Sequence, residues 1–282
     1  INSFTGDRTE FLGKNGSMNR PAALARETLS NRIGVAMDPC AALQVRIDLQ
    51  DGEEGEIIFT CGAGQNVDDA RRLVKRFRGS ASARTALEQV WSYWNHTLGV
   101  VHVETEDKAL DVLTNGWLLY QTLSCRMWAR TGYYQSSGAY GFRDQLQDSM
   151  ALVYAEPGIF REHLLLCASH QFVEGDVLHW WHPPFERGVR THSSDDRLWL
   201  PLAVHRYVTT TGDVGVLNES IHFITGGLLA PEEDSSYHLP AKSAESGTLY
   251  EHCVRSIKCS LQFGRHGLPL MGTGDWNDGM NR

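Results

Sequence analysis

Three segments of this chain gather side chains that could act on a polar ligand. The last of them, residues 267–281, places Asp275 and Asp278 on either side of Trp276 and Asn277, with glycines close by. A carboxyl group that is partly desolvated beside an indole has a raised pKa, so it can stay protonated at neutral pH and act as a general acid. The other interpretation is a turn in which Asp and Asn side chains bind nearby backbone groups.

The first segment, residues 136–145, reads Ser-Ser-Gly-Ala-Tyr-Gly-Phe-Arg-Asp-Gln. Its two glycines allow the backbone to approach a ligand closely. Arg143 and Asp144 then open the next predicted helix, where they could contact a sugar. Asp144 could equally stabilise that helix through its dipole.

The middle segment, residues 171–196, is rich in aromatic and polar side chains. Trp180 and Trp181 form either a lid on the core or a platform for pyranose rings, whose C–H faces stack on aromatic rings. Asp195 and Asp196 lie just before or at the start of a helix in which Pro201 should occupy the first turn. We predict that this segment, including His182, contacts a sugar.

Several side chains of the middle segment are also of the kinds that bind metals, namely Asp176, His179, His182 and His192. A His-x-x-His spacing in a loop, without Cys or a Glu at a defined spacing, is weak support for zinc. Hydrogen bonds to sugar hydroxyls account for the same residues. We therefore predict neither a metal site nor a cofactor.

The elements that would position these segments fall into two regions. Up to residue 65 the pattern is of strands and turns, with an alternating run over 43–49, a turn at Asp51-Gly52 and a β-rich run over 55–61. We interpret residues 1–65 as the end of a β-sandwich, residues 66–104 as a helical linker, and residues 105–282 as a helical domain.

From about residue 67 the apolar residues recur at helical spacing. The pattern predicts a long helix from about 109 to 130 and further helices over 144–155, 158–172, 197–211, 214–226 and 245–264, with polar aromatic loops between them. A mainly α region with functional residues in such loops suits an α/α barrel. Two packed helical layers in another arrangement would give the same pattern.

Composition argues against several classes of protein. The net charge of −8 disfavours nucleic-acid binding, and the basic run over 71–78 has the spacing of a solvated helix face. No apolar run approaches the roughly 18 residues of a membrane-spanning helix. Six scattered cysteines without a CxxC pair indicate buried free thiols in a reducing compartment. Because the chain begins with Ile1 and stops at Arg282, we expect part of a longer protein.

Four motifs, in this order, resemble glycoside hydrolase family 94: GAYGFRDQ at 138–145, GDVLHWWH at 175–182, RTHSSDD at 190–196 and GDWNDGMN at 274–281. That family contains cellobiose, chitobiose and oligoglucan phosphorylases. The segments RTEFLG at 8–13, RPAAL at 20–24 and DPCAALQ at 38–44 are similar to the phosphorylase-like C-terminal region of cyclic β-1,2-glucan synthases. The resemblance extends over essentially the whole chain.

The resemblance implies the closing strands of a β-sandwich, a helical linker and the first part of an (α/α)6 barrel. It also implies inverting phosphorolysis of a β-linked glucan, in which phosphate replaces the water and general base of an inverting hydrolase and α-glucose 1-phosphate is formed. By motif, Asp278 would be the general acid. Arg190, Asp196 and Trp276 would hold the transferred glucose, and Asp195 fits the spacing less well than Asp196.

Two departures from the family concern phosphate. The family's upstream phosphate-binding Arg, about ten residues before the Arg190 position, is replaced here by His-Trp-Trp-His. Its other phosphate groups, a His and a Thr-Gly pair, belong to the second half of the barrel. Two alternatives follow: an inverting hydrolase in which Asp144 or Asp196 activates water, and a glycan-binding module without turnover.

The expected partners are a β-glucan and inorganic phosphate as co-substrate, with no nucleic acid. Members of the family often dimerise. The cysteine pattern and the resemblance place the chain in the cytoplasm, or at the cytoplasmic face of the inner membrane as part of a glucan synthase.

Overall fold

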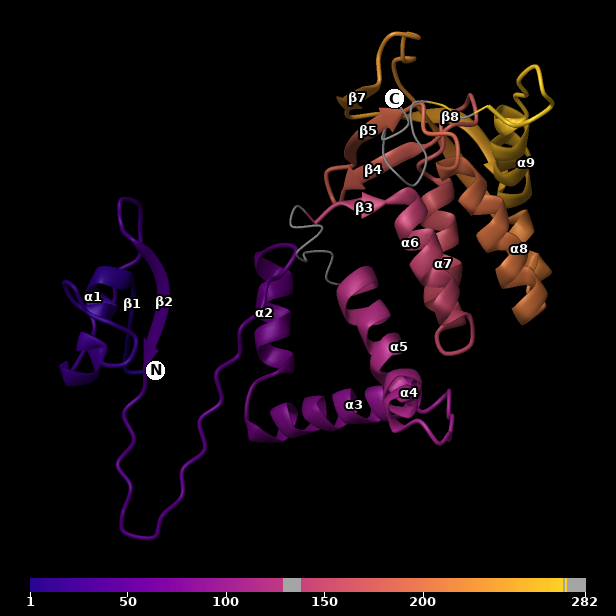
Figure 1. Cartoon of the computed structure of the whole chain (residues 1–282). Helices are drawn as coiled ribbons and strands as arrows, with labels where there is room; N and C mark the ends of the chain where they lie inside the picture. The colour runs from indigo at the N-terminus through magenta and orange to yellow at the C-terminus, as the bar shows by residue number, and fades with distance from the viewer. Residues whose placement is uncertain (129–137, 271, 273–282) are drawn as a thin grey trace. The chain divides into compact units, whose positions relative to one another are not determined.

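The structure, a computed structural model, describes residues 1–128, 138–270 and 272, and the chain forms two compact units, residues 1–88 and 89–282. The boundary between them falls inside the predicted helical linker. Figure 1 shows the elements of both units.

The first unit contains a two-stranded antiparallel sheet. Strand β1 (Ser3–Asp7) pairs with β2 (Pro39–Gln44), and the short helix α1 (Arg8–Leu12) follows β1 directly. Asp7 caps α1 by accepting a hydrogen bond from the Thr9 backbone N–H. A small core of Ala23, Leu29 and Ala42 lies beside the sheet.

The strand predicted over 43–49 is confirmed only at Leu43 and Gln44, and the strand predicted over 55–61 is wrong. Strand β2 ends at Gln44, and residues 45–61 belong to no strand. An alternating pattern selects a face, but a strand also needs a neighbour to satisfy its backbone N–H and C=O groups. Among the described residues none pairs with 45–61. The turn at Asp51-Gly52 is confirmed, and Gly52 has a φ of 81°.

The basic run lies on helix α2 (Val67–Arg76) except for its last residue, Arg78, and α2 precedes helix α3 (Ser80–Leu98). Asn66 caps α2, with acidic residues in its first turn and basic residues in its last, as the helix dipole favours. The side chains of Arg71 and Arg72 are 72% and 78% exposed and pair with aspartates three residues earlier. The predicted solvated helix face is confirmed.

The predicted long helix is broken in its first half. Helix α4 (Lys108–Val112) is separated from α5 (Leu118–Gln121) by non-helical backbone at Asn115 and Gly116, and helical turns then continue to Trp128. The Asn115 side chain binds the backbone N and O of Val103 at 2.6 and 2.7 Å, so it competes with the helix for backbone partners. The prediction of one continuous helix is therefore wrong.

Four further helices of the second unit are close to the predicted ones: α6 (Phe142–Ser149), α7 (Pro157–Ala168), α8 (Trp199–Thr211) and α9 (Leu249–Ser260). Their ends follow local rules. Pro157 begins α7, Gly212 ends α8 in the left-handed conformation with a φ of 74°, and Thr248 and Glu251 form a capping box for α9. Helices α6, α7 and α8 pack together around a buried core that includes Leu146, Phe160, Leu164 and Leu200.

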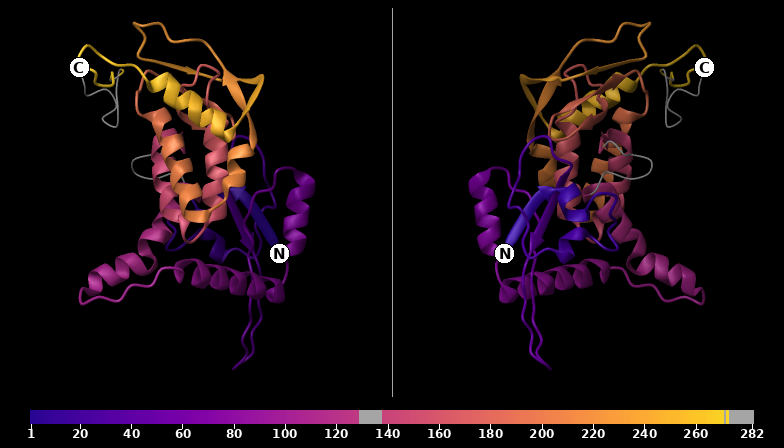
Figure 2. Two further views of the ribbon diagram at one scale, coloured as in Figure 1. Left: turned by 90° about the vertical axis from the view of Figure 1, so that its right-hand side faces the viewer. Right: turned by 90° about the vertical axis from the view of Figure 1, so that its left-hand side faces the viewer.

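Two sheets in the second unit were not predicted. One is antiparallel with the order β3-β4-β5-β7, and the other pairs β6 with β8. Figure 1 shows the four-stranded sheet at one end of α6 and α7, and Figure 2 shows the β6–β8 pair beside α9. The strands are β3 (Tyr140–Gly141), β4 (Leu178–His182), β5 (Arg187–Thr191), β6 (Ser220–Thr225), β7 (Ser235–His238) and β8 (Ala241–Thr248).

These strands correct the mainly α prediction, because the second unit mixes helix and sheet. The helix predicted over 214–226 is wrong: a short helical turn at Val214–Asn218 leads into β6. Ile221 and Phe223 of β6 are buried, while His222 between them is exposed, which is the period of a strand. The helix predicted over 245–264 is confirmed only for α9.

All six cysteines are free thiols, as predicted. Cys167 and Cys253 are buried, but Cys61 and Cys125 are exposed, so the prediction of burial is wrong for those two. Cys61 is the last residue of the 45–61 segment that forms no strand, so no packed layer covers it. None of the helices in the described ranges is long and apolar enough to cross a membrane.

Two buried histidines determine how stability should depend on pH. Burial lowers the pKa of His163 and of His252 to about 4. The unfolded chain binds protons near the ordinary pKa of about 6.5, whereas the folded chain binds them only near 4. The free energy of unfolding is therefore at its full value above about pH 6.5 and falls as the pH decreases towards 4.

We expect this loss to be about 2 kcal/mol per histidine between neutral pH and about pH 4.5, in denaturant titrations of the complete natural chain. His252 is the better test, because its Nε2 lies 3.2 Å from the Ile221 carbonyl oxygen and its Nδ1 has no partner in the described part of the chain. His252→Gln should weaken the pH dependence, and the exposed His205→Gln should not. The same pH dependence in both variants would contradict this assignment.

Candidate active site

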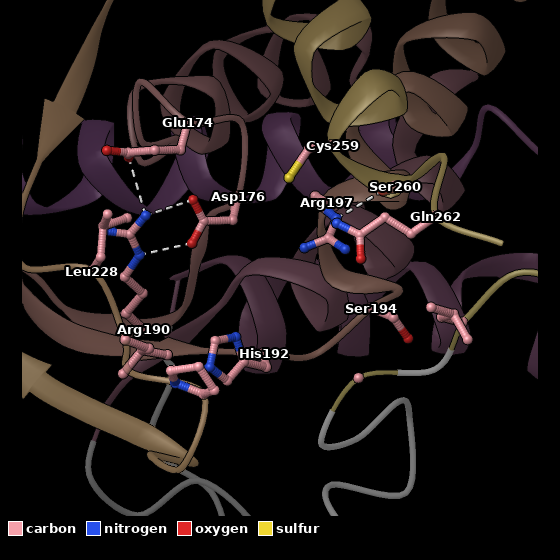
Figure 3. Close-up of a pocket in the computed structure, with 14 residues that line it drawn as sticks. Glu174, Asp176, Arg190, His192, Ser194, Arg197, Leu228, Cys259, Ser260 and Gln262 are labelled. Carbon is pink, nitrogen blue, oxygen red and sulfur yellow. Dashed lines mark hydrogen bonds and ion pairs between the residues drawn. The ribbon is translucent and has the colours of Figure 1, made fainter. Parts of the chain in front are cut away.

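The middle and last segments singled out in the sequence meet at a cavity of about 470 Å³ in the second unit (Figure 3). Its walls come from residues around 174–176, 190–197, 228–231 and 259–262, with Leu270 and Gly272. The size is that of a small-ligand site. The walls are partly apolar, with charged groups at fixed places, as is usual where orientation of a ligand matters.

Arg190, on β5, forms one side of this cavity. Its Nε and Nη2 donate to the two carboxylate oxygens of Asp176 at 2.7 Å each, and Nη2 also donates to Glu174 at 3.1 Å. Its Nη1 donates to the carbonyl oxygens of Gly226 and Gly227 at 3.5 and 3.1 Å. The guanidinium carbon lies 3.8 Å from the centre of the Phe172 ring. All five N–H groups are therefore used within the protein.

The guanidinium of Arg190 stays protonated although the side chain is buried. Burial disfavours the charged guanidinium, but its bonds to Asp176 and its attraction to Glu174 raise its pKa above the ordinary value. The two carboxylates keep lone pairs that Arg190 does not use. They can accept hydrogen bonds from the hydroxyl groups of a ligand.

Asp195 and Asp196 form a second polar cluster with residues of the first segment. Asp196 is buried and its Oδ2 lies 2.7 Å from His179 Nδ1. Asp195 Oδ2 accepts from Arg143 at 3.4 Å and from the Trp199 indole at 3.3 Å. Burial raises the pKa of Asp196, and the bond to His179 opposes that shift.

One oxygen on each of these aspartates lacks a partner. Asp195 Oδ1 and Asp196 Oδ1 are buried and accept no hydrogen bond from any residue that the structure describes. An unsatisfied buried carboxylate oxygen is costly. Ser194 and Arg197, which flank the pair in sequence, both line the cavity. Neither aspartate is itself among the residues that line the cavity.

Gly272 connects the cavity to the last segment. A Cβ at this position would lie 1.7 Å from the His192 carbonyl oxygen, so only glycine fits there. Trp276 and Asp278 follow in residues 273–282, which lie outside the described residues. The wall of the cavity thus includes the residue two positions before the predicted catalytic motif at 274–281.

The structure brings together four of the predicted site residues. Arg143 lies 3.5 Å from Asp144 and 3.4 Å from Asp195, and Asp196 follows with His179 as its partner. These residues come from β4, the beginning of α6 and the turn before α8, which are far apart in sequence. The first and middle segments therefore contribute to one cluster of polar side chains.

The structure places the paired tryptophans differently from the prediction. Trp181 has no exposed surface and stacks on His170, with ring centres 3.8 Å apart, so the prediction that it contacts a sugar is wrong. Successive side chains of a strand point to opposite faces, which sends Trp181 into the core and Trp180 outward. Trp180 packs near Tyr237 at 5.5 Å, and His182 lines a separate cavity of about 550 Å³ with Tyr237.

Sequence reasoning missed Glu174, Arg197 and Gln262 as cavity residues. Glu174 and Arg197 lie within or next to the middle segment, and their charge was the available signal. Gln262 was assigned to a predicted helix that in fact ends at Ser260. Among the residues with described positions, no group of three or more His, Cys, Asp or Glu side chains could hold a metal ion.

The fold and the site agree with a family of carbohydrate-active enzymes. The description "Glycosyl hydrolase 94 superfamily, catalytic domain" matches residues 93–282, and "Glycosyl hydrolase 94, supersandwich domain" matches residues 1–80. The chain belongs to the glycosyl hydrolase 94 superfamily.

Individual relatives include both a synthase and phosphorylases. The chain is 43% identical, over its full length, to cyclic β-(1,2)-glucan synthase NdvB of Rhizobium meliloti (strain 1021), of which it spans 10%. Over 99% of its length it is 25% identical to N,N'-diacetylchitobiose phosphorylase of Vibrio proteolyticus, of which it spans 36%. Over 63% of its length it is 28% identical to 1,2-β-oligoglucan phosphorylase of Listeria innocua serovar 6a, of which it spans 16%.

Proposed function

We propose that this chain is part of an inverting phosphorylase that acts on a β-1,2-linked glucan. The observation that carries the proposal is the cavity wall of Asp176 and Glu174, whose carboxylates Arg190 holds in place and which keep lone pairs that Arg190 does not use. Sugars present several hydroxyl donors to such acceptors. Family membership supports the reaction class, and the names of the glucan synthase and oligoglucan phosphorylase relatives support the linkage.

In the proposed reaction a phosphate oxygen attacks the anomeric carbon from the face opposite the glycosidic bond. The new C–O bond forms as the glycosidic C–O bond breaks, and Asp278 gives its proton to the departing oxygen. The product is α-glucose 1-phosphate together with a glucan shortened by one residue. Trp276 would pack against the transferred glucose.

Two groups of carboxylates among the described residues have proposed roles in sugar binding. We propose that Asp195 and Asp196, which Arg143 and His179 hold in place, accept sugar hydroxyls through their unpartnered Oδ1 atoms. Arg190 has no N–H left for a ligand, so we propose that it holds Asp176 and Glu174 at the cavity wall and that these carboxylates accept sugar hydroxyls. We also propose that residues 105–282 form the first part of an (α/α)6 barrel, which the side-by-side packing of α6, α7 and α8 supports.

The test uses the complete natural chain with linear β-1,2-glucan, with and without inorganic phosphate. We expect α-glucose 1-phosphate to appear only when phosphate is present. Glucose released equally in both samples would replace the proposal with an inverting hydrolase, in which Asp144 or Asp196 activates water. Glucan binding without any product would indicate a binding module.

A further inference from the structure

The cavity is lined by two arginines among the described residues, and only one of them is committed to the protein. Arg190 uses all five N–H groups, as described above. Arg197, at the turn that leads into α8, uses its Nε to donate to Ser260 Oγ at 2.7 Å. Its Nη1 and Nη2 groups make no hydrogen bond to the described residues. Arg197 is therefore a cation in the cavity wall whose Nη1 and Nη2 groups can donate hydrogen bonds to a ligand.

The hydrogen bond to Ser260 fixes the orientation of the Arg197 side chain. Ser260 Oγ donates in turn to the Ser256 carbonyl oxygen at 2.9 Å, so the hydroxyl that receives the Arg197 bond is itself held on α9. A guanidinium anchored through Nε presents its two terminal nitrogens as a planar fork. This geometry suits two oxygens of one tetrahedral anion.

The two sides of the cavity differ in charge. Figure 3 shows Arg190 with its two carboxylates on one side and Arg197 with Gln262 and Ser194 on the other. The Arg190 side carries one guanidinium and two carboxylates, so its formal charge is −1. The side chains of Gln262 and Ser194 have no hydrogen-bond partner in the described part of the chain and can donate to an anion.

Because of this difference in charge, we expect one side of the cavity to bind hydroxyl groups and the other to bind an anion. A carboxylate-rich wall repels an anion but accepts hydrogen bonds from hydroxyls, whereas a free guanidinium attracts the anion. We propose that Arg197 binds the phosphate co-substrate, with Gln262 and Ser194 as further donors, while the Arg190 side receives sugar hydroxyls. The inference rests on the proposed phosphorylase function and assigns its phosphate-specific residue.

The experiment compares initial rates of phosphorolysis by the complete natural chain over a range of phosphate and glucan concentrations. Arg197→Gln should raise the KM for phosphate about 10- to 100-fold, the effect of losing charge-assisted hydrogen bonds, and should leave the KM for glucan within about threefold. Arg197→Lys should lie between, because it keeps the charge but loses the fork. Ser260→Ala should raise the KM for phosphate less than Arg197→Gln does.

The matched control is Arg206→Gln on α8, because Arg206 is exposed and, among the described residues, donates only to the Tyr154 hydroxyl, at 3.4 Å. It should change neither KM. Added guanidinium should partly restore the phosphate KM of Arg197→Gln, which a purely structural role would not predict. An unchanged phosphate KM in Arg197→Gln, or a rise confined to the glucan KM, would overturn the assignment.

A second measurement separates this inference from the proposed function. Binding of inorganic phosphate alone is followed by calorimetry for the wild type and for Arg197→Gln, with thermal unfolding as the check on folding. If the wild type forms no product but binds phosphate, and Arg197→Gln does not, the anion site stands and the phosphorylase proposal fails. If the wild type does not bind phosphate, the anion site is wrong.

Discussion

Replacing Asp278 with asparagine should lower kcat for glucan phosphorolysis by about 10²- to 10⁴-fold, the usual contribution of a general acid. The amide cannot protonate the departing oxygen, although it has nearly the size and shape of the carboxylic acid. The Kd for glucan should therefore stay nearly unchanged. The measurement pairs steady-state rates with equilibrium glucan binding, both on the complete natural chain.

Asp275→Asn is the matched control, because Asp275 lies in the same motif and has no part in the proposed reaction. It should retain most of the activity that Asp278→Asn loses. An equal loss in both variants would show that the motif as a whole is structural. An Asp278→Asn variant with wild-type kcat would remove Asp278 from the mechanism.

Replacing Arg190 with methionine should lower the free energy of unfolding by about 3 kcal/mol, the lower end of the range for breaking a buried ion pair. The substitution leaves Asp176 and Glu174 without their cation and the carbonyl groups of Gly226 and Gly227 without their donor. The lower end applies because the Glu174 side chain is 40% exposed and water can solvate it again.

The control is Arg187→Met on the same strand. Arg187 is exposed and its guanidinium lies 5.6 Å from the Tyr237 ring centre, so we expect a change below about 1 kcal/mol. Chemical denaturation of the complete natural chain measures both variants. If the two cost the same, Arg190 is not the structural centre of the cavity wall.

The helices were predictable because local signals determine their ends. Pro157, Gly212 and the Thr248–Glu251 pair begin or end helices through contacts within a few residues. Strands depend on distant partners, and this explains the errors. Ile221 pairs with Gly247, and Trp180 with Val189, and neither partner is visible from local periodicity. The same limitation produced the false strand predictions within residues 45–61.

For the site, the sequence indicated which segments matter but not which atoms face the ligand. Asp195, Asp196 and Arg143 were identified from their residue types, and the structure brings them together. Trp181 could not be separated from Trp180, because only strand pairing decides which of two neighbours points to the core. Arg190 was expected to touch a sugar, yet its partners, 14 to 37 residues away in sequence, occupy all its donors.

The bonds of Arg190 also constrain the order in which this part of the molecule can form. One guanidinium joins β5 to the 174–176 loop and to the Gly226–Gly227 segment after β6, and a backbone hydrogen bond joins Val173 to Ile224. None of these three segments can separate from the others without stranding a buried charge. The cavity wall should therefore be lost cooperatively with its unit, as a single foldon, and not through the opening of one loop at a time.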